Sequence, residues 1–146
     1  MMTTQSPGLA LVSLLVRDYD AAIAWYTSRL PFVLAEDTPL GGGKRWVVLA
    51  PSCGQGTGLL LARADGPGQE RRIGDQAGGR VFLFLRVDDA ERQYAAMTAA
   101  GVAFEAPPRH EPYCWVAVFR DLYRNRRDIS RPARPPGPPT PCGRRG

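Results

Sequence analysis

The sequence predicts an α+β fold made of two copies of one βαβββ module, and its internal repeat is the main reason. The stretch LVSLLVRDYDAAIAWYTSRLPFVLAED, which begins at Leu11, is matched about 70 residues later by VFLFLRVDDAERQYAAMTAAGVAFEAP. Within these stretches Asp18 corresponds to Asp89, and further on Trp46-Val-Val-Leu corresponds to Trp115-Val-Ala-Val. A period of this size indicates a duplicated structural unit. We therefore expect each half to contain a strand, a helix and then three strands.

The first half begins with a strand and a helix. Residues 9–16 are rich in leucine and β-branched residues, which predicts a strand, and Asp18 is suited to cap the following helix. Pro31 should end that helix, because proline disfavours helical geometry at the preceding residue. One apolar stripe at helical spacing is formed by Tyr19, Ala22, Ile23, Tyr26 and Leu30. Strands should follow at 32–36, 45–50 and 57–62, with a hairpin turn at Gly41-Gly42-Gly43.

The second half repeats this order. Asp88 and Glu91 have the spacing of a capping box, which places a helix start at Asp88. Gly101 is suited to a left-handed C-cap, and the apolar stripe consists of Ala90, Tyr94 and Met97. Strands are expected at 103–105, 113–120 and 127–129.

Composition divides the chain into four parts. Modules are expected at 8–62 and 80–130, joined by a polar linker at 63–79 that is either an exposed loop or a flap over a pocket. Residues 131–146 contain six prolines, three glycines and no large apolar residue, so we expect a disordered tail.

The charge of the chain is concentrated in that tail. The net charge is +5, but residues 131–146 hold four arginines and no acid, so the remainder is nearly neutral. A nucleic-acid partner is therefore not expected. No apolar run approaches the roughly 18 residues of a membrane span, and the first ten residues lack the basic segment of a secretory signal. Three widely spaced cysteines indicate neither a disulfide framework nor a zinc knuckle, and a cytoplasmic protein is expected.

The repeated module, with VRDYDAAIAWY opening the first half, RVDD opening the second and DLYRNRRDI closing it, resembles the vicinal oxygen chelate superfamily. This superfamily includes glyoxalase I, bleomycin-resistance proteins and extradiol dioxygenases. The resemblance covers residues 8–130. It implies an incomplete, strongly curved eight-stranded barrel, a homodimer and a small-molecule site in a concave sheet. The chain departs from the family where Arg124 replaces a turn glycine and Pro31 replaces a glycine before an aromatic residue.

The metal site of the superfamily is not reproduced by these residues. Where the resemblance implies His, Glu or Gln ligands, this chain has Leu11, Val81 and one of Leu59-Leu60-Leu61. Only Asp128 matches a donor, and a hard cation held by one carboxylate would bind weakly. We expect no cofactor, with Asp128 the one candidate ligand for Mn, Fe, Ni or Zn. The alternative for Asp128 is a surface carboxylate or a partner of a neighbouring arginine.

Candidate ligand-binding residues concentrate before and within the late strands. The segment 109–115 combines an imidazole, a carboxylate, a phenol, a thiol and an indole. His110 could serve as acid or base near neutral pH, although polar residues before a strand are commonly solvated. A catalytic thiol at Cys114 is not expected, and no catalytic residue is assigned. The candidates are Trp46, Arg86, His110, Glu111, Tyr113, Trp115 and Asp128.

Three functions follow from these patterns. The first is a small-molecule-binding protein of the glyoxalase/bleomycin-resistance type without the usual metal. The alternative is a lyase, transferase or dioxygenase that uses a divalent metal on nonstandard ligands. In the third, the arginine–proline tail makes the interaction and the fold only carries it.

Overall fold

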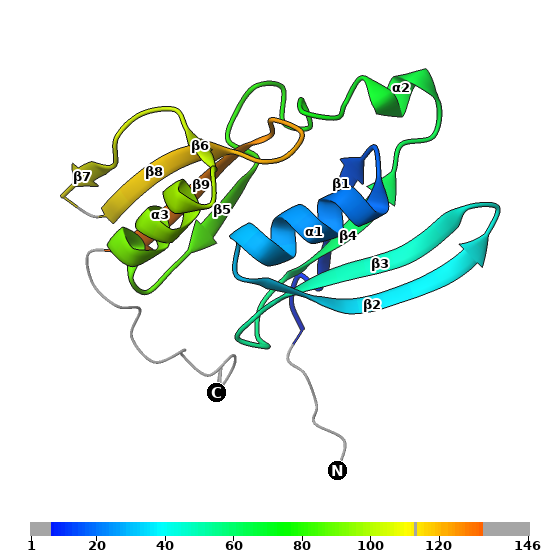
Figure 1. Cartoon of the computed structure of the whole chain (residues 1–146), viewed down its shortest axis with the longest axis horizontal. Helices are drawn as coiled ribbons and strands as arrows, with labels where there is room; N and C mark the ends of the chain where they lie inside the picture. The colour runs from blue at the N-terminus through cyan, green and yellow to red at the C-terminus, as the bar shows by residue number, and fades with distance from the viewer. Residues whose placement is uncertain (1–6, 113, 133–146) are drawn as a thin grey trace, which may run out of the picture. The chain divides into compact units, whose positions relative to one another are not determined.

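The computed structural model describes residues 7–112 and 114–132, which form two compact units (Figure 1). Of the described residues, the first unit contains those up to Arg80 together with Leu122–Asn125, and the second contains those from Val81 to Asp121 and from Arg126 to Pro132. Each unit has its own sheet and its own main helix, as the repeat predicts.

The first unit has a four-stranded sheet in the order β1-β4-β3-β2. β1 pairs with β4 in parallel, and the other neighbours are antiparallel. The elements are β1 (Leu11–Val16), α1 (Tyr19–Arg29), β2 (Phe32–Gly41), β3 (Lys44–Pro51), β4 (Gly58–Arg63) and a short helix α2 (Gly66–Glu70).

The second unit has a five-stranded sheet in which β5-β9-β8-β6 form the main path and β7 also pairs with β8. β5 runs parallel to β9, and the remaining pairs are antiparallel. The elements are β5 (Leu83–Arg86), α3 (Ala90–Ala99), β6 (Ala103–Phe104), β7 (Arg109–Glu111), β8 (Cys114–Arg120) and β9 (Arg126–Pro132). The α+β class and the module order are confirmed, with nine described strands where eight were expected.

The helix signals in the first half are confirmed by the structure. Asp18 caps α1, and its Oδ1 accepts a hydrogen bond from the Ala21 amide at 2.7 Å. Leu30, the residue before Pro31, leaves the helix in an extended conformation. Of the predicted stripe, Tyr19, Ala22, Tyr26 and Leu30 are buried.

The start of the second helix was predicted one residue too early. Asp89, not Asp88, is the N-cap of α3, and its carboxylate accepts a hydrogen bond from the Arg92 amide at 3.0 Å. The internal repeat already aligned Asp89 with the cap residue Asp18, so it placed the start better than the capping-box spacing did. Gly101 has φ +85°, as its C-cap role requires.

The structure also differs from the sequence prediction at the boundaries of the linker and of the tail. The expected linker 63–79 contains the helix α2, and β9 continues to Pro132, so Arg131 belongs to the sheet and not to the tail. Residues 133–146, on which the rest of the tail prediction falls, lie outside the described residues.

The turn between β8 and β9 contains Arg124, which stands where the family has a turn glycine. Arg124 has φ +69°, the only positive φ at a non-glycine residue in the described chain. The same turn packs closely on Gly74, where a Cβ would lie 2.5 Å from the Tyr123 carbonyl oxygen. Left-handed geometry is costly for a residue with a side chain, so this turn holds Arg124 under strain.

Within the described residues, no helix is long and apolar enough to cross a membrane.

Candidate functional site

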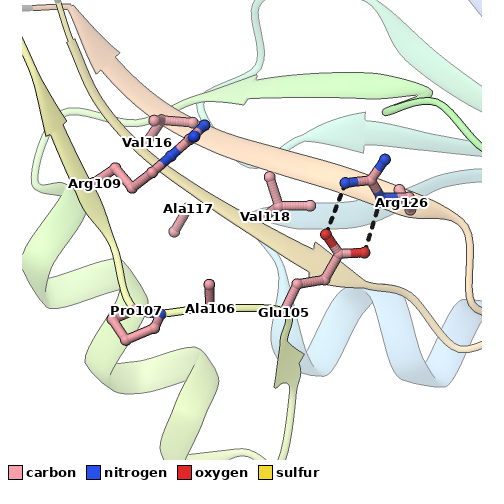
Figure 2. Close-up of a pocket in the computed structure, with 8 residues that line it drawn as sticks. All are labelled: Glu105, Ala106, Pro107, Arg109, Val116, Ala117, Val118 and Arg126. Carbon is pink, nitrogen blue, oxygen red and sulfur yellow. Dashed lines mark hydrogen bonds and ion pairs between the residues drawn. The ribbon is translucent and has the colours of Figure 1, made fainter.

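The candidate site is a pocket in the second unit, beside the central strand β8 (Figure 2). Its volume is about 190 Å³. Val116, Ala117 and Val118 of β8 form one side, and the segment Glu105–Pro107 forms the other. Arg109 and Arg126 complete the lining, so apolar walls are combined with a few charged groups. This composition is typical of small-molecule sites.

The pocket exists because the edge strand of this sheet is interrupted. Phe104 pairs with Phe119 and Arg109 with Val116, so the edge strand has two more residues than β8 between these pairs. The extra residues include Pro107 and Pro108, which have no amide hydrogen to donate to a strand partner. The chain therefore bows away from β8 between β6 and β7 and leaves space there.

The two faces of the second sheet have different roles. Trp115 and Phe104 contact Tyr94 of α3 with ring centroids 6.1 and 4.4 Å apart, so α3 covers their face. We call the opposite face of this sheet the pocket face, and we assign residues to it from the strand pairing and from the alternation of side chains along each strand. They are Phe84, Arg86, Arg109, Glu111, Cys114, Val116, Val118, Arg120, Arg126, Asp128 and Ser130.

One end of the pocket is closed by an ion-pair cluster. Arg126 donates from Nε to Oε1 and from Nη2 to Oε2 of Glu105, both at 2.8 Å, which is a bidentate pair (Figure 2). Arg120 adds a third contact, from Nη2 to Oε1 at 2.7 Å. Hydrogen bonding to Arg126 holds the pKa of Glu105 below its ordinary value. Glu105 is therefore ionised at neutral pH and shared by two guanidinium groups.

The other end of the pocket has a more exposed cation. The side chain of Arg109 is 69% exposed, and its contact to Glu111, Nε to Oε1, is long at 4.0 Å. Arg109 faces Val116 in the strand pairing, and Figure 2 shows its guanidinium beside that strand. Such an exposed, long ion pair contributes little to stability, so the guanidinium is free to engage a ligand.

Asp128 lies on the pocket face directly across from Val118. It is 3% exposed, and its Oδ1 has no hydrogen-bond partner among the described residues. Burial raises the pKa of Asp128 to about 6, against the lowering effects of the Arg109 charge and a hydrogen bond with Ser130. Both sequence-based alternatives for this residue need correction, because it is not on the surface and its neighbours Arg126 and Arg127 pair with Glu105 and Asp121 instead.

Three of the seven predicted site residues lie on the pocket face, but none of these three lines the pocket. Arg86, Glu111 and Asp128 share the pocket face. His110 and Trp115 lie on the other face, where their rings are in contact with centroids 6.3 Å apart. Trp115 is buried at 4% exposure beneath α3.

The remaining two predicted residues are separate from this group. Trp46 is in the first unit, on β3, and is 37% exposed, so the two tryptophans that the repeat aligns have different environments. Tyr113 lies outside the described residues. Cys114 is on the opposite face of the sheet from His110.

The sequence interpretation missed Glu105, Arg109 and Arg126 as pocket residues. The signal that points to them is the Pro107-Pro108 pair inside a stretch that otherwise alternates like a strand. Two prolines at an edge strand indicate a bulge, and polar residues next to a bulge are candidates for a site.

The donor set of these residues does not fit a metal centre of the superfamily type. Leu11, Leu59 and Val81 are apolar, and the other carboxylates on the side of Asp128, Glu105 and Glu111, contact arginines. In the described part of the chain, no three His, Cys, Asp or Glu residues lie together in a way that could hold a metal ion.

Comparisons with known proteins agree with this architecture. An uncharacterized protein of Shewanella frigidimarina is 50% identical over 119 residues, covering 81% of this chain and 88% of its own. The crystal structure of UcmS2 is 26% identical with a TM-score of 0.74, covering 86% of this chain and 98% of its own. The crystal structure of TnmS3, an antibiotic binding protein from Streptomyces sp. CB03234, is 28% identical with a TM-score of 0.71, covering 90% and 100%.

The sequence model of one family spans most of the two units. Residues 8–126 match the model of the Glyoxalase/Bleomycin resistance protein/Dioxygenase superfamily. Together with the repeated βαβββ modules, this match shows that the chain belongs to that superfamily.

Proposed function

We propose that the chain binds a small organic molecule in the pocket beside β8, without a metal ion. The observation that carries the proposal is the pocket itself, in which three β8 residues form an apolar wall between two charged ends. The similarity to TnmS3, whose structure is described as an antibiotic binding protein, supports a binding function.

The chemistry of the pocket favours binding over catalysis. The one carboxylate that lines it, Glu105, accepts contacts from two guanidinium groups and has a lowered pKa, so it is a poor proton acceptor or nucleophile. The remaining lining residues are arginines and apolar residues. Such groups enclose and orient a ligand, which is the mode of action of a sequestering protein.

The test is native mass spectrometry of the whole chain with a panel of antibiotics small enough to enter a pocket of about 190 Å³. We expect a one-to-one complex with at least one compound. The variant Val116→Trp fills the pocket and should abolish that complex, whereas Val33→Trp, at an exposed position of β2 in the first unit, should leave it intact. Equal binding by both variants, or no complex with any compound, would contradict the proposal.

The metal-free part of the proposal has its own measurement. Elemental analysis of protein purified without chelator or affinity tag should show no stoichiometric metal. Near-stoichiometric Mn, Fe, Ni or Zn would instead support the alternative, a metal-dependent lyase, transferase or dioxygenase with nonstandard ligands.

We also propose that the protein acts as a cytoplasmic homodimer, which is the usual assembly in the family that it resembles. Size-exclusion chromatography at micromolar concentration should give about twice the chain mass of 16.0 kDa. Elution at the mass of one chain would rule the dimer out.

A further inference from the structure

The size of the pocket beside β8 limits what it can hold. An apolar cavity of about 150 Å³ accommodates benzene. The pocket here is about 190 Å³, which leaves space for one six-membered ring and a small substituent. Its apolar wall consists of Val116, Ala117 and Val118, so the ring would lie along β8.

The charges at the pocket favour a negatively charged substituent. At one end the carboxylate of Glu105 is contacted by both Arg120 and Arg126, so two guanidinium groups lie at this end. At the other end the guanidinium of Arg109 is largely exposed and only loosely held by Glu111, at 4.0 Å. A guanidinium presents parallel donors that match the two oxygens of a carboxylate.

Asp128 lies on the pocket face but is not one of the residues that line the pocket. Its Oδ1 is buried without a partner among the described residues. Burial raises the pKa of this carboxyl to about 6, so it is ionised at pH 7.5 and opposes the binding of an anion. The charge of Arg109, which lowers that pKa, has to outweigh this repulsion.

From these observations we infer that the pocket selects a single-ring aromatic acid, with the ring against Val116 and Val118 and the carboxylate held by Arg109. This inference rests on the proposed small-molecule function and adds the chemical class of the ligand. Arg109 is thus a specificity-determining residue, because it recognises the charge and not the ring.

The test compares benzoate with benzamide, which share ring and shape but differ in charge. Binding of each to the whole chain is followed at pH 7.5 by ligand-observed NMR and by shifts in ¹H–¹⁵N spectra. We expect benzoate to bind about fivefold more tightly than benzamide, the effect of one exposed charge-assisted contact. The largest amide shifts should fall on Glu105, Ala106, Arg109 and residues 116–118.

Two variants assign the preference to its residue. Arg109→Gln should bring benzoate down to the affinity of benzamide and leave benzamide unchanged. Arg92→Gln, on the exposed surface of α3 across the sheet, is the matched control and should bind like the unaltered protein. Asp128→Asn removes the opposing charge from the pocket face and should strengthen benzoate binding.

The outcomes separate this inference from the proposal on which it rests. If benzamide binds as well as benzoate, or if Arg109→Gln keeps the preference, the acidic ligand class is wrong while small-molecule binding stands. If neither compound binds, the inference is also overturned, and the antibiotic panel then decides the proposed function.

Discussion

Asp128 shows how the position of one residue reverses the usual pH behaviour of a carboxylate. Its side chain is buried, and its pKa is raised to about 6 from an ordinary value of 3.8, because burial penalises the charged form. A carboxyl whose pKa rises on folding makes the folded state more stable at low pH and less stable at high pH. For this residue the change falls between about pH 4 and pH 7.

Replacing this charge should therefore stabilise the protein at high pH. Asp128→Asn keeps the shape and removes the ionisation, so it should raise the free energy of unfolding by about 1 to 3 kcal/mol at pH 8. The difference from the unaltered protein should disappear near pH 3, where Asp128 is largely protonated in both the folded and the unfolded state. Urea unfolding at the two pH values measures it, and a difference that is independent of pH would show that Asp128 is not the titrating group.

Arg124 is a second residue whose backbone decides its contribution. Its φ of +69° costs little for glycine but is unfavourable for residues with a Cβ. Arg124→Gly should be more stable than Arg124→Ala by about 1 kcal/mol, since both lose the arginine side chain and only alanine keeps the strain. Thermal unfolding of the pair gives the difference directly. Equal midpoints would mean that the turn relaxes to a negative φ.

At the scale of the element, the interrupted edge strand is the source of the site. The segment between β6 and β7 has two residues more than the part of β8 that it faces. Glu105 already donates from its amide to the Val118 carbonyl at 2.9 Å, and removal of Pro107 and Pro108 would place Ala106 opposite Ala117. That register continues the pairs already present on either side.

Deletion of Pro107 and Pro108 should thus give a continuous edge strand and close the pocket. We expect an unfolding midpoint at or above that of the unaltered protein, because the strand gains backbone hydrogen bonds, together with loss of ligand binding. Calorimetry and the antibiotic panel measure the two effects. Retained binding in a well-folded deletion variant would place the site elsewhere.

The signals for helices and turns could be predicted from the sequence because they are local. Asp18, Pro31 and Gly101 each act within a few residues of their position, through a cap, a forbidden conformation or a positive φ. The pocket could not be predicted in this way, because it depends on which residue of β8 faces each residue of the edge strand. Register is a property of two strands, and Asp128 is buried only through what surrounds it on the sheet.

At the scale of the whole molecule, the duplication explains why equivalent residues have different roles. Trp46 and Trp115 align in the repeat, yet one is partly exposed and the other is buried beneath α3. A duplicated module keeps the fold, because the buried stripes of both helices are retained, while its surface positions diverge. The repeat therefore predicts the architecture well and the site poorly.

The chain ending at Pro132 should keep both the fold and the ligand, since both cores and the pocket are built from residues before that point. We expect its unfolding midpoint and its binding to the antibiotic panel to match those of the full chain. Selective loss of binding in a truncated protein that still folds would favour the third hypothesis, in which residues 131–146 make the interaction.

The segment that joins the two halves has an effect on β1 that follows from one side chain. Gln76 accepts a hydrogen bond from the Leu15 amide at 2.9 Å and donates one to the Leu15 carbonyl at 3.1 Å. β1 lies at the end of its sheet, where unpaired backbone groups can template the strand of another molecule. The side-chain amide of Gln76 takes the place of one residue of a neighbouring strand, so both backbone hydrogen-bonding groups of Leu15 are already satisfied at that edge.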